Sequence, residues 1–376
     1  MKRFGHTGFA QTHTQDLIRA AAKSTRVIGL GGGLPAEAQF PREALAASFV
    51  AVLHRQGSPA LQYGWPEGQE PLRAWVARRL CERGAKVAAD DVIITNGAQE
   101  GIAIAASLAL PKGASIGVET ASYPAALELF RNRGLPVVSL TEGRAAYVMP
   151  AIGNPSGRPL PREARLALLG RSIPIIEDDA YADLDFAARS PRPLLAEAPD
   201  RTYHVGTTSK TLCPGLRVGW LVVPPAHRSR ALKLKQDVDL QANSLAQAIV
   251  DHYLSRTDFD ARLATLRRFY RFRATQLAEA VRKTLPSWGF DFPEGGFCLW
   301  LDTDAAVDEK RFLERAIAEG VSFDLGSAFL LRSNPTEPTR LRLSFSFERP
   351  EKFKEGIRRL ARAWRWAAKS AKRTRR

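Results

Sequence analysis

Short runs of consecutive apolar residues recur along the first two thirds of the chain, separated by turns and by amphipathic stretches. Uninterrupted apolar runs of this length are typical of strands buried on both faces, as in parallel sheets. Their alternation with helical patterns predicts an α/β fold, in which a mostly parallel sheet lies between helices. The expected strands are 92–95, 115–118, 146–150, 173–177, 202–206 and 218–223.

The last third of the chain has a different pattern. Apolar residues recur at helical spacing from Phe259 to about Leu285 and predict one long helix. Residues 339–347 alternate between apolar and polar, as in a half-buried strand. We therefore expect a large domain at 46–255 and a smaller α+β domain at 256–376, which the N-terminal segment 1–45 joins.

Composition limits the compartment, the metal content and the partners that we expect for the protein. The 376 residues are 45% hydrophobic, which suits full cores, yet no apolar stretch reaches the roughly 20 residues that cross a membrane. The N-terminus lacks an apolar signal core, and the three cysteines form neither a disulfide framework nor a CxxC metal pair. We therefore expect a cytoplasmic protein without a metal site. The net charge of +16 favours anionic ligands. The one dense basic run in the sequence, 369–376, fits a solvated terminus. Neither a membrane nor a nucleic acid is therefore an expected partner.

A hydroxyl-rich loop follows the apolar run 203–205 and contains Thr207, Ser209 and Lys210, with Arg217 further along. A lysine that forms a Schiff base must be held in place and have a lowered pKa. Hydroxyls and a guanidinium beside it suit a phosphate dianion. Taken alone, the loop also fits an ordinary surface loop with a solvated lysine.

Three other polar positions follow expected strands. The turn at 97–99 opens a helix, where backbone N–H groups can bind an anion. Tyr123 follows the second strand, and Asp178 stands in the acidic cluster 177–179. Without the lysine loop, the turn at 97–99 would be a generic strand–helix junction. The acidic cluster has a metal site as its alternative, although no His or Cys lies near it in the sequence.

These motifs resemble, in the same order, those of fold-type-I aminotransferases that depend on pyridoxal 5'-phosphate (PLP). Four further segments share the resemblance: 32–35 (GGLP), 63–68 (YGxxxG), 154–157 (NPSG) and 293–300 (PEGGFCLW). The subgroup that the chain resembles most is that of 2-aminoadipate and kynurenine aminotransferases, from about Thr14 to about Glu348. The resemblance implies the fold of that family and a homodimer with a shared active site. It also implies transfer of an amino group between an L-α-amino acid and a 2-oxo acid through a PLP Schiff base.

The resemblance assigns the cofactor contacts. Lys210 is implied to form the Schiff base and then to act as general base. Asp178 is implied to keep the pyridine nitrogen protonated, because PLP works as an electron sink only in that state. Tyr181 and Asn154 are implied to contact the phenolic oxygen. The remaining implied contacts are Tyr123 and Ala180 on the ring, and Gly97, Ala98, Gln99, Thr207, Ser209, Arg217 and the neighbouring subunit's Tyr63 around the phosphate.

The resemblance also assigns substrate contacts. Arg342 fills the place of the arginine that binds the α-carboxylate, and an arginine within a strand needs such a partner. Arg340 should lie on the same strand face and is its main rival. Gly33 and Asn154 are implied to lie against the substrate. Arg19 matches an arginine that meets a distal carboxylate, but an ordinary helix-surface arginine fits it equally well.

One segment departs from the family pattern. Only residues 141–145 separate the apolar run 136–140 from the strand at 146–150, whereas a parallel crossover usually needs a dozen residues or more. Family members carry a helix-containing segment here. We expect the strand at 136–140 to be displaced, or the pair to be locally antiparallel, beside the wall that contains Asn154.

Two other functions share this fold. MocR-type transcriptional regulators carry an aminotransferase-like domain behind a DNA-binding domain, for which the roughly 30 residues before the glycine-rich segment are too few. Another PLP reaction, such as β-elimination or decarboxylation, also uses this scaffold. Arg342 favours transamination over decarboxylation, because anchoring the carboxylate does not suit its loss.

Overall fold

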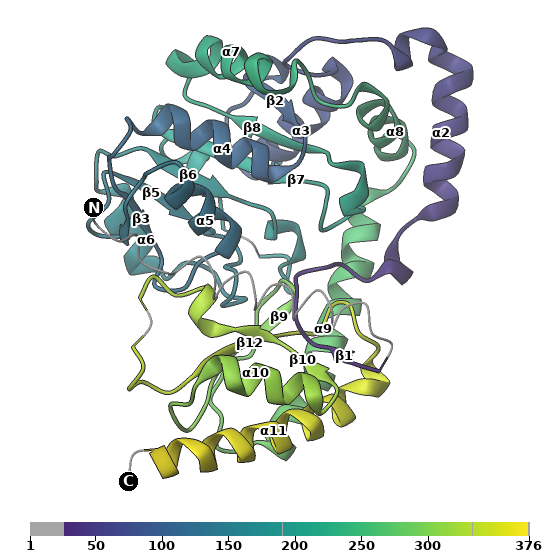
Figure 1. The fold of residues 1–376 in the computed structure, drawn as a ribbon. Helices are drawn as coiled ribbons and strands as arrows, with labels where there is room; N and C mark the ends of the chain where they lie inside the picture. Colours follow the sequence, from purple (N-terminus) through teal and green to yellow (C-terminus); the bar gives the residue numbers. More distant parts are fainter. Residues whose placement is uncertain (1–25, 190, 333, 375–376) are drawn as a thin grey trace, which may run out of the picture. The chain divides into compact units, whose positions relative to one another are not determined.

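The computed structural model describes residues 26–189, 191–332 and 334–374 (Figure 1). The chain divides into two compact units. The larger unit contains Glu37–Phe269 and Glu294–Gly296, and the smaller one contains the chain up to Ala36 with Tyr270–Pro293 and Phe297–Arg376. The domain bounds expected from the sequence, 46–255 and 256–376, differ from those of these two units and stay a prediction.

A seven-stranded sheet forms the centre of the larger unit, and its strand order is β2-β8-β7-β6-β5-β3-β4. All neighbours pair in parallel except β8, which is antiparallel to β2 and to β7. The predicted α/β class is thereby confirmed. The strands are β2 (Val92–Thr95), β3 (Ile116–Val118), β4 (Val137–Ser139), β5 (Ala145–Val148), β6 (Ile175–Asp178), β7 (Thr202–Thr207) and β8 (Gly219–Val222).

Helices cover this sheet because its strands are apolar on both faces. Helix α4 (Ala98–Ala109) lies across β6, β7 and β8 (Figure 1). A closely packed core joins α3 (Glu70–Glu82) and α8 (Ser244–Leu254) to β2 and β8 through buried side chains such as Trp75 and Val250. The other helices of this unit are α2 (Arg42–Gln56), α5 (Pro124–Asn132), α6 (Arg162–Leu169) and α7 (Arg228–Asp239).

The short segment after β4 crosses the neighbouring strand. β4 occupies the sheet edge, and β3 separates it from β5, to which β4 is connected. Since β3 pairs in parallel with both, β4 and β5 run in the same direction, so the expectation of an antiparallel pair is wrong. The expected displacement of this strand from its place in the family stays a prediction. Residues 140–144 make this crossing without the usual helix. A Cβ on Gly143 would lie 2.1 Å from the backbone nitrogen of Gly117, so the two backbones pass each other at glycine.

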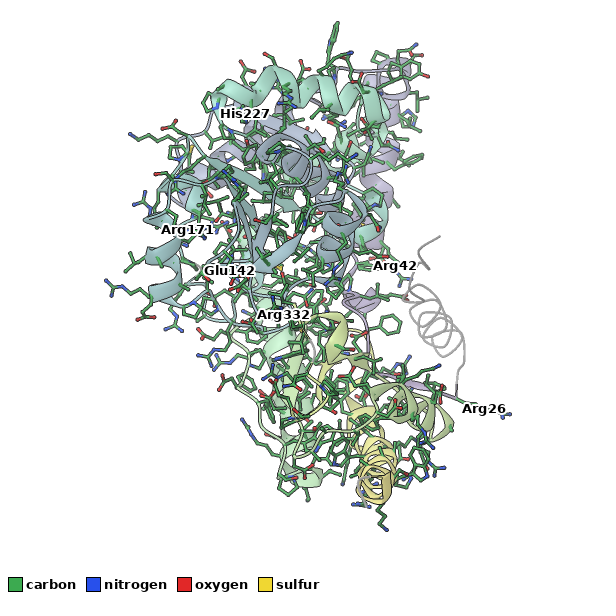
Figure 2. The ribbon with its side chains drawn as sticks, turned by 60° about the vertical axis from the view of Figure 1, so that its left-hand side comes forward. Arg26, Arg42, Glu142, Arg171, His227 and Arg332 are labelled. Atoms are coloured by element: carbon green, nitrogen blue, oxygen red, sulfur yellow. The ribbon has the colours of Figure 1, made fainter. Side chains whose placement is uncertain are left out.

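An arginine from the following helical region holds the crossing in place. Nη1 of Arg171 donates to the carbonyl of Leu140 and Nη2 to that of Gly143, each at 2.6 Å. Arg171 lies near Glu142, which belongs to the crossing segment itself (Figure 2). Its two bonds satisfy backbone carbonyls of the crossing segment.

The smaller unit contains a three-stranded antiparallel sheet in the order β11-β12-β9. A parallel pair, β1 with β10, lies in the same unit, and its strand β1 precedes the glycine-rich segment. The predicted long helix is confirmed as α9, which leads from the larger unit into this one. The elements are α9 (Phe259–Thr284), α10 (Glu309–Ala318), α11 (Phe353–Thr374), β1 (Ile28–Gly29), β9 (Cys298–Asp302), β10 (Val321–Ser322), β11 (Asp324–Leu325) and β12 (Arg340–Ser344). Within the described ranges, no helix is both long and apolar enough to span a bilayer.

Candidate active site

A pocket of about 600 Å³ opens at the carboxyl ends of the parallel strands in the larger unit. Ligands bind at this edge of open α/β sheets, because loops and helix N-termini converge there. Predicted residues from every motif of this unit except Tyr63 line the pocket. They are Ala98, Gln99, Tyr123, Asn154, Asp178, Ala180, Tyr181, Thr207, Ser209, Lys210 and Arg217.

One end of the pocket gathers hydrogen-bond donors. Helix α4 begins after Gly97, whose φ of 88° suits glycine, and its first turn contributes Ala98 and Gln99. The hydroxyls of Thr207 and Ser209 lie 2.9 Å apart. Arg217 packs so closely that a Cβ on Gly97 would lie 2.5 Å from its Nη2. A helix N-terminus, two hydroxyls and a guanidinium together suit a phosphate dianion.

A buried carboxylate marks another part of the pocket. Asp178 is 3% exposed, and its Oδ1 accepts from the N–H of Ala180 at 3.2 Å. Its Oδ2 accepts from the hydroxyl of Tyr147 at 2.7 Å. Burial raises the pKa of Asp178, whereas the hydrogen bond from Tyr147 lowers it.

Tyr147 is not among the predicted site residues, because in the sequence it is part of an apolar strand. Tyr147 pairs in register with Ile176, two residues before Asp178, so its side chain is on the face of the sheet that carries Asp178. The parallel pairing of β5 with β6 and the alternation along each strand are the signals that identify it.

Lys210 lies close to the predicted aromatic and amide contacts. Its Nζ is 5.3 Å from the centroid of the Tyr181 ring. Asn154, 7% exposed, and Tyr181, 6% exposed, line the same pocket despite the shortened crossing segment before them. The apolar part of the lining, which was not predicted from the sequence, consists of Ile102, Met149 and Pro214.

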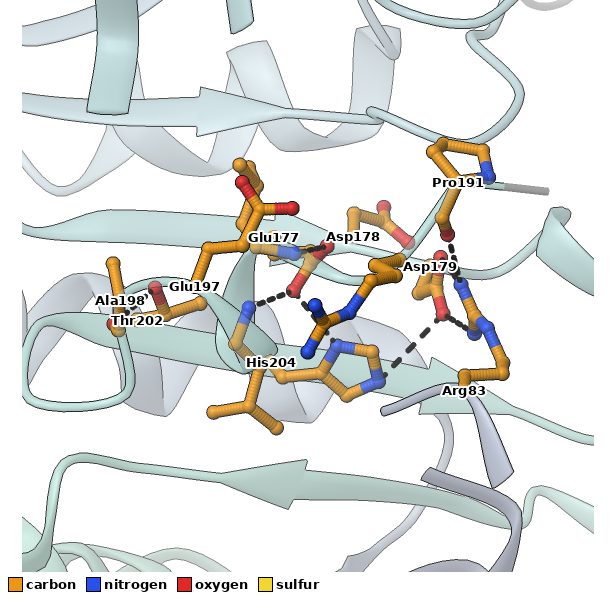
Figure 3. Close-up of polar contacts among 12 residues, drawn as sticks. Arg83, Glu177, Asp178, Asp179, Pro191, Glu197, Ala198, Thr202 and His204 are labelled. Carbon is orange, nitrogen blue, oxygen red and sulfur yellow. Dashed lines mark hydrogen bonds and ion pairs between the residues drawn. The ribbon is translucent and has the colours of Figure 1, made fainter. Parts of the chain in front are cut away.

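The two acids beside Asp178 point to the other face of the sheet. Glu177 accepts from the backbone N–H groups of Leu194 and Leu195 and contacts Nδ1 of His204 at 3.1 Å (Figure 3). Asp179 forms an ion pair with Arg83. The alternation along β6 thus places Asp178 in the pocket and gives its neighbours structural partners. Within the described ranges, no group of three or more His, Cys, Asp or Glu residues is arranged to hold a metal.

The other predicted residues lie elsewhere. Arg342 is in the smaller unit, on β12, and pairs with Asp324 at 2.7 Å, while its rival Arg340 pairs with Asp302 at 2.6 Å. Gly33 belongs to the smaller unit as well. Tyr63, in the larger unit, is 78% exposed. Arg19 falls outside the described residues, so its role stays a prediction.

The pocket fits the cofactor that the motifs imply. It provides phosphate donors, a lysine amine, and a buried carboxylate that would oppose a protonated ring nitrogen. Asp178 suits that position because Tyr147 and Ala180 already satisfy one lone pair on each of its oxygens. The residues present therefore match each chemical part of PLP.

Comparison with known proteins gives the same result. The profile of the family "Aminotransferase class I and II" matches residues 25–145 and 141–360. A 2-aminoadipate transaminase of Thermus thermophilus is 32% identical over 92% of this chain and 93% of that protein. The crystal structure of an α-aminoadipate aminotransferase from the same species, complexed with N-(5'-phosphopyridoxyl)-L-leucine, superposes with a TM-score of 0.84 at 31% identity, over 94% of this chain and 95% of that one.

A regulator also resembles the chain, at lower identity. A helix-turn-helix type transcriptional regulator of Bacillus subtilis is 26% identical over 90% of this chain, which spans 74% of that protein. The aminotransferases match over nearly their whole length, 93% and 91%. The chain therefore belongs to the class I and II aminotransferases, and it is an enzyme whose cofactor is pyridoxal 5'-phosphate.

Proposed function

We propose that this aminotransferase exchanges amino groups between L-α-amino acids and 2-oxo acids, with Lys210 as its central residue. The observation that carries this proposal is the pocket that combines Lys210 with Asp178 and the phosphate donors. The leucine compound bound by the solved relative and the name of the 2-aminoadipate transaminase support α-amino acids as the substrate class.

Each pocket residue has a proposed task. When bound, PLP supplies an electron sink that stabilises negative charge at the α-carbon of the substrate. Lys210 would hold the cofactor covalently, and its Nζ would serve as the general base that takes the proton from the α-carbon of the substrate. The carboxylate of Asp178 holds a proton on the ring nitrogen, and Tyr181 and Asn154 hydrogen-bond the phenolic oxygen. Tyr123 and Ala180 would pack on the ring.

The substrate residues complete the proposal. Arg342 binds the α-carboxylate through its guanidinium, which matches a carboxylate in shape and charge. Gly33 allows the backbone to approach the substrate closely. Arg19 binds the distal carboxylate of substrates that have one, such as glutamate or 2-aminoadipate.

The enzyme is further proposed to act as a homodimer in the cytoplasm. Exposed apolar side chains support an interface around Tyr63: Leu61 is 65% exposed, Tyr63 78% and Trp65 77%. The N–H of Gly64 donates to the side chain of Gln241, whose sequence neighbour Leu240 is 59% exposed. Such a cluster of exposed apolar residues is typical of an interaction surface. Free thiols at Cys81, Cys213 and Cys298 fit a reducing compartment.

One assay tests the reaction type. The purified protein, loaded with PLP, is incubated with an L-α-amino acid, and the 2-oxo acid formed is measured without and with an acceptor 2-oxo acid. A transaminase forms about one equivalent per active site alone and many equivalents with the acceptor. Release of ammonia without an acceptor would indicate a lyase, and loss of carbon dioxide a decarboxylase. Absence of any exchange would favour the regulatory alternative.

A second measurement tests the dimer. Sedimentation of the PLP-loaded protein should give twice the chain mass, and Trp65→Asp should produce monomers that bind PLP more weakly. Tyr63→Phe should leave the dimer intact but weaken PLP binding, since it removes only the hydroxyl. A monomeric wild type that binds PLP fully would exclude the shared active site.

A further inference from the structure

One carboxylate joins the two parts of the smaller unit that the proposed function assigns to the substrate. Asp324 lies directly opposite Arg342 in the antiparallel register of β11 and β12. Its Oδ2 accepts from Nε of Arg342 at 2.9 Å and from Nη2 at 2.7 Å. The same oxygen accepts from the backbone N–H of Gly32 at 2.8 Å. Asp324 therefore connects the arginine of β12 with the glycine-rich segment 31–33.

The ion pair is shielded, and an aromatic ring limits its freedom. The side chain of Arg342 is 8% exposed and that of Asp324 is 16% exposed. Cζ of Arg342 lies 4.6 Å from the centroid of the Phe329 ring. Charge-assisted hydrogen bonds are strongest where water is excluded, and a guanidinium beside an aromatic ring is held in orientation as well as in position. The Arg342 guanidinium is consequently confined to a narrow range of orientations.

The glycine-rich segment is docked on the same strand. The N–H of Ser344 donates to the carbonyl of Leu30 at 2.6 Å, and the hydroxyl of Ser346 donates to the carbonyl of Leu34 at 2.5 Å. Between these two anchors, Gly32 has a φ of 82°, and a Cβ on Gly31 would lie 3.1 Å from Oδ1 of Asp324. The carboxylate thus contacts the middle of the segment, immediately before Gly33.

We propose that Asp324 is a positioning residue for the substrate, which fixes Arg342 and the glycine-rich segment in one arrangement that receives the α-carboxylate. This inference rests on the proposed function, in which Arg342 binds that carboxylate. A guanidinium has two edges that can bind a carboxylate with two hydrogen bonds. Asp324 engages the edge formed by Nε and Nη2, which fixes the plane of the guanidinium.

The neighbouring pair provides a matched control. Arg340 lies two positions before Arg342 on β12 and pairs with Asp302 on β9, whereas Asp324 is on β11. The side chains of Arg340 and Asp302 are 33% and 52% exposed. Loss of this exposed pair should have little effect on the substrate site, because exposed ion pairs contribute little and Asp302 has no part in the proposed binding.

The experiment measures both substrates for the PLP-loaded wild type and for Asp324→Asn, Asp324→Ala, Asp302→Asn and Arg342→Ala. Asp324→Ala should raise KM for the amino acid and for the 2-oxo acid by roughly tenfold, with kcat changed less than about twofold. Asp324→Asn, which keeps the shape and one acceptor, should have an intermediate effect. Asp302→Asn should match the wild type. The absorbance spectrum of the bound cofactor, recorded without substrate, should be the same in all four variants.

Three results would overturn the inference: an unchanged KM in both Asp324 variants, a lower KM, or an equal rise in Asp302→Asn. A lower KM would mean that Asp324 competes with the substrate instead of orienting its partner. Arg342→Ala separates the two levels of the proposal. If that variant keeps the wild-type KM, the proposed role of Arg342 fails. If it raises KM while the Asp324 variants do not, only the role of Asp324 fails. Should Asp324→Ala not fold, Asp324→Asn and Asp324→Glu provide the same comparison.

Discussion

The hydroxyl of Tyr147 donates a hydrogen bond to Oδ2 of Asp178 at 2.7 Å, and both side chains are buried. The two residues come from adjacent parallel strands, β5 and β6. The edge-to-face contact of Tyr147 with Phe130, at 5.3 Å between ring centroids, fixes the direction of the hydroxyl. Because burial raises the pKa of Asp178 and this bond lowers it, Tyr147 helps keep the carboxylate ionised.

Tyr147→Phe should therefore weaken the cofactor site. It leaves one buried carboxylate oxygen without its donor, which costs about 1–3 kcal/mol of unfolding free energy. PLP should bind more weakly, as equilibrium dialysis would measure, because a larger fraction of Asp178 is neutral. Tyr203→Phe is the matched control, since Tyr203 is a buried residue of β7 on the same sheet and its hydroxyl contacts His227, which lies outside the sheet. An equal loss of PLP affinity in both variants would show that the effect is general to the sheet.

The two neighbouring aspartates should respond differently to the loss of their charge. Asp178→Asn should keep the fold and lower turnover by orders of magnitude, because the ring nitrogen loses its counter-ion. Asp179→Asn should retain turnover but lower stability, because Arg83 loses its buried partner. Turnover and urea unfolding of both variants test this assignment. A crippled Asp179→Asn beside an active Asp178→Asn would place the essential acid one residue further along.

Borohydride reduction of the PLP-loaded protein should attach the cofactor to Lys210 alone, as peptide mapping would reveal. Lys235 provides an internal control, because it is buried and forms ion pairs with Glu100 and Asp239. Lys210→Ala should bind PLP loosely and lose turnover. Label recovered at Lys235, or none at Lys210, would contradict the central role of Lys210.

Glu119 introduces a pH dependence near neutrality. Burial raises the pKa of Glu119 from 4.5 to about 7, against the hydrogen bond from the N–H of Met149. Between these values the folded chain binds the proton more tightly than the unfolded chain does. The resulting stabilisation is complete below pH 4.5 and is lost as the pH rises through about 7. Glu119→Gln should remove this loss.

The test of Glu119 is a comparison of unfolding free energies by urea, for wild type and Glu119→Gln, from about pH 5 to about pH 8. The unfolding free energy of the variant should rise relative to that of the wild type by up to about 1.4 kcal/mol for each pH unit in that range. Above the upper value the difference should become constant. Parallel curves throughout would mean that Glu119 titrates normally.

Much of the pocket was predictable because its residues stand in short local motifs. Lys210, Asp178 and the turn at 97–99 each follow an apolar run, and the carboxyl ends of parallel strands meet at one edge. The contacts of Tyr147 and Asp324 could not be predicted in this way. Their partners are 31 and 18 residues away in the chain, and only strand pairing brings them together.

The strand order posed the same difficulty. The short interval 141–145 indicated an unusual connection between two strands, but the sequence does not show that β3 lies between β4 and β5. A parallel connection of this length is possible only if the backbone can cross a strand at close range. That condition involves a glycine on each side, and such a pair is not visible before the pairing is known.

The crossing itself yields the last prediction. A Cβ at Gly143 would lie 2.1 Å from the backbone nitrogen of Gly117 and 2.5 Å from the carbonyl oxygen of Ala145, and backbone atoms cannot move aside as a flexible side chain can. Gly143→Ala should therefore lower the unfolding free energy by about 3 kcal/mol, at the upper end of what overpacking costs. It should also weaken PLP binding, because β5 leads directly into the pocket residue Met149.

Gly170→Ala is the matched control for the crossing. Gly170 has a right-handed backbone with φ of −70°, and its added Cβ would lie 3.5 Å from the nearest atom, so this variant should stay within about 0.5 kcal/mol of the wild type. Arg171→Ala should fall between the two, since it removes both bonds to the crossing carbonyls but adds no clash. Urea unfolding of the three variants gives the order directly. If Gly143→Ala is as stable as Gly170→Ala, the backbones do not pass each other at this distance, and the connection must follow another path around β3.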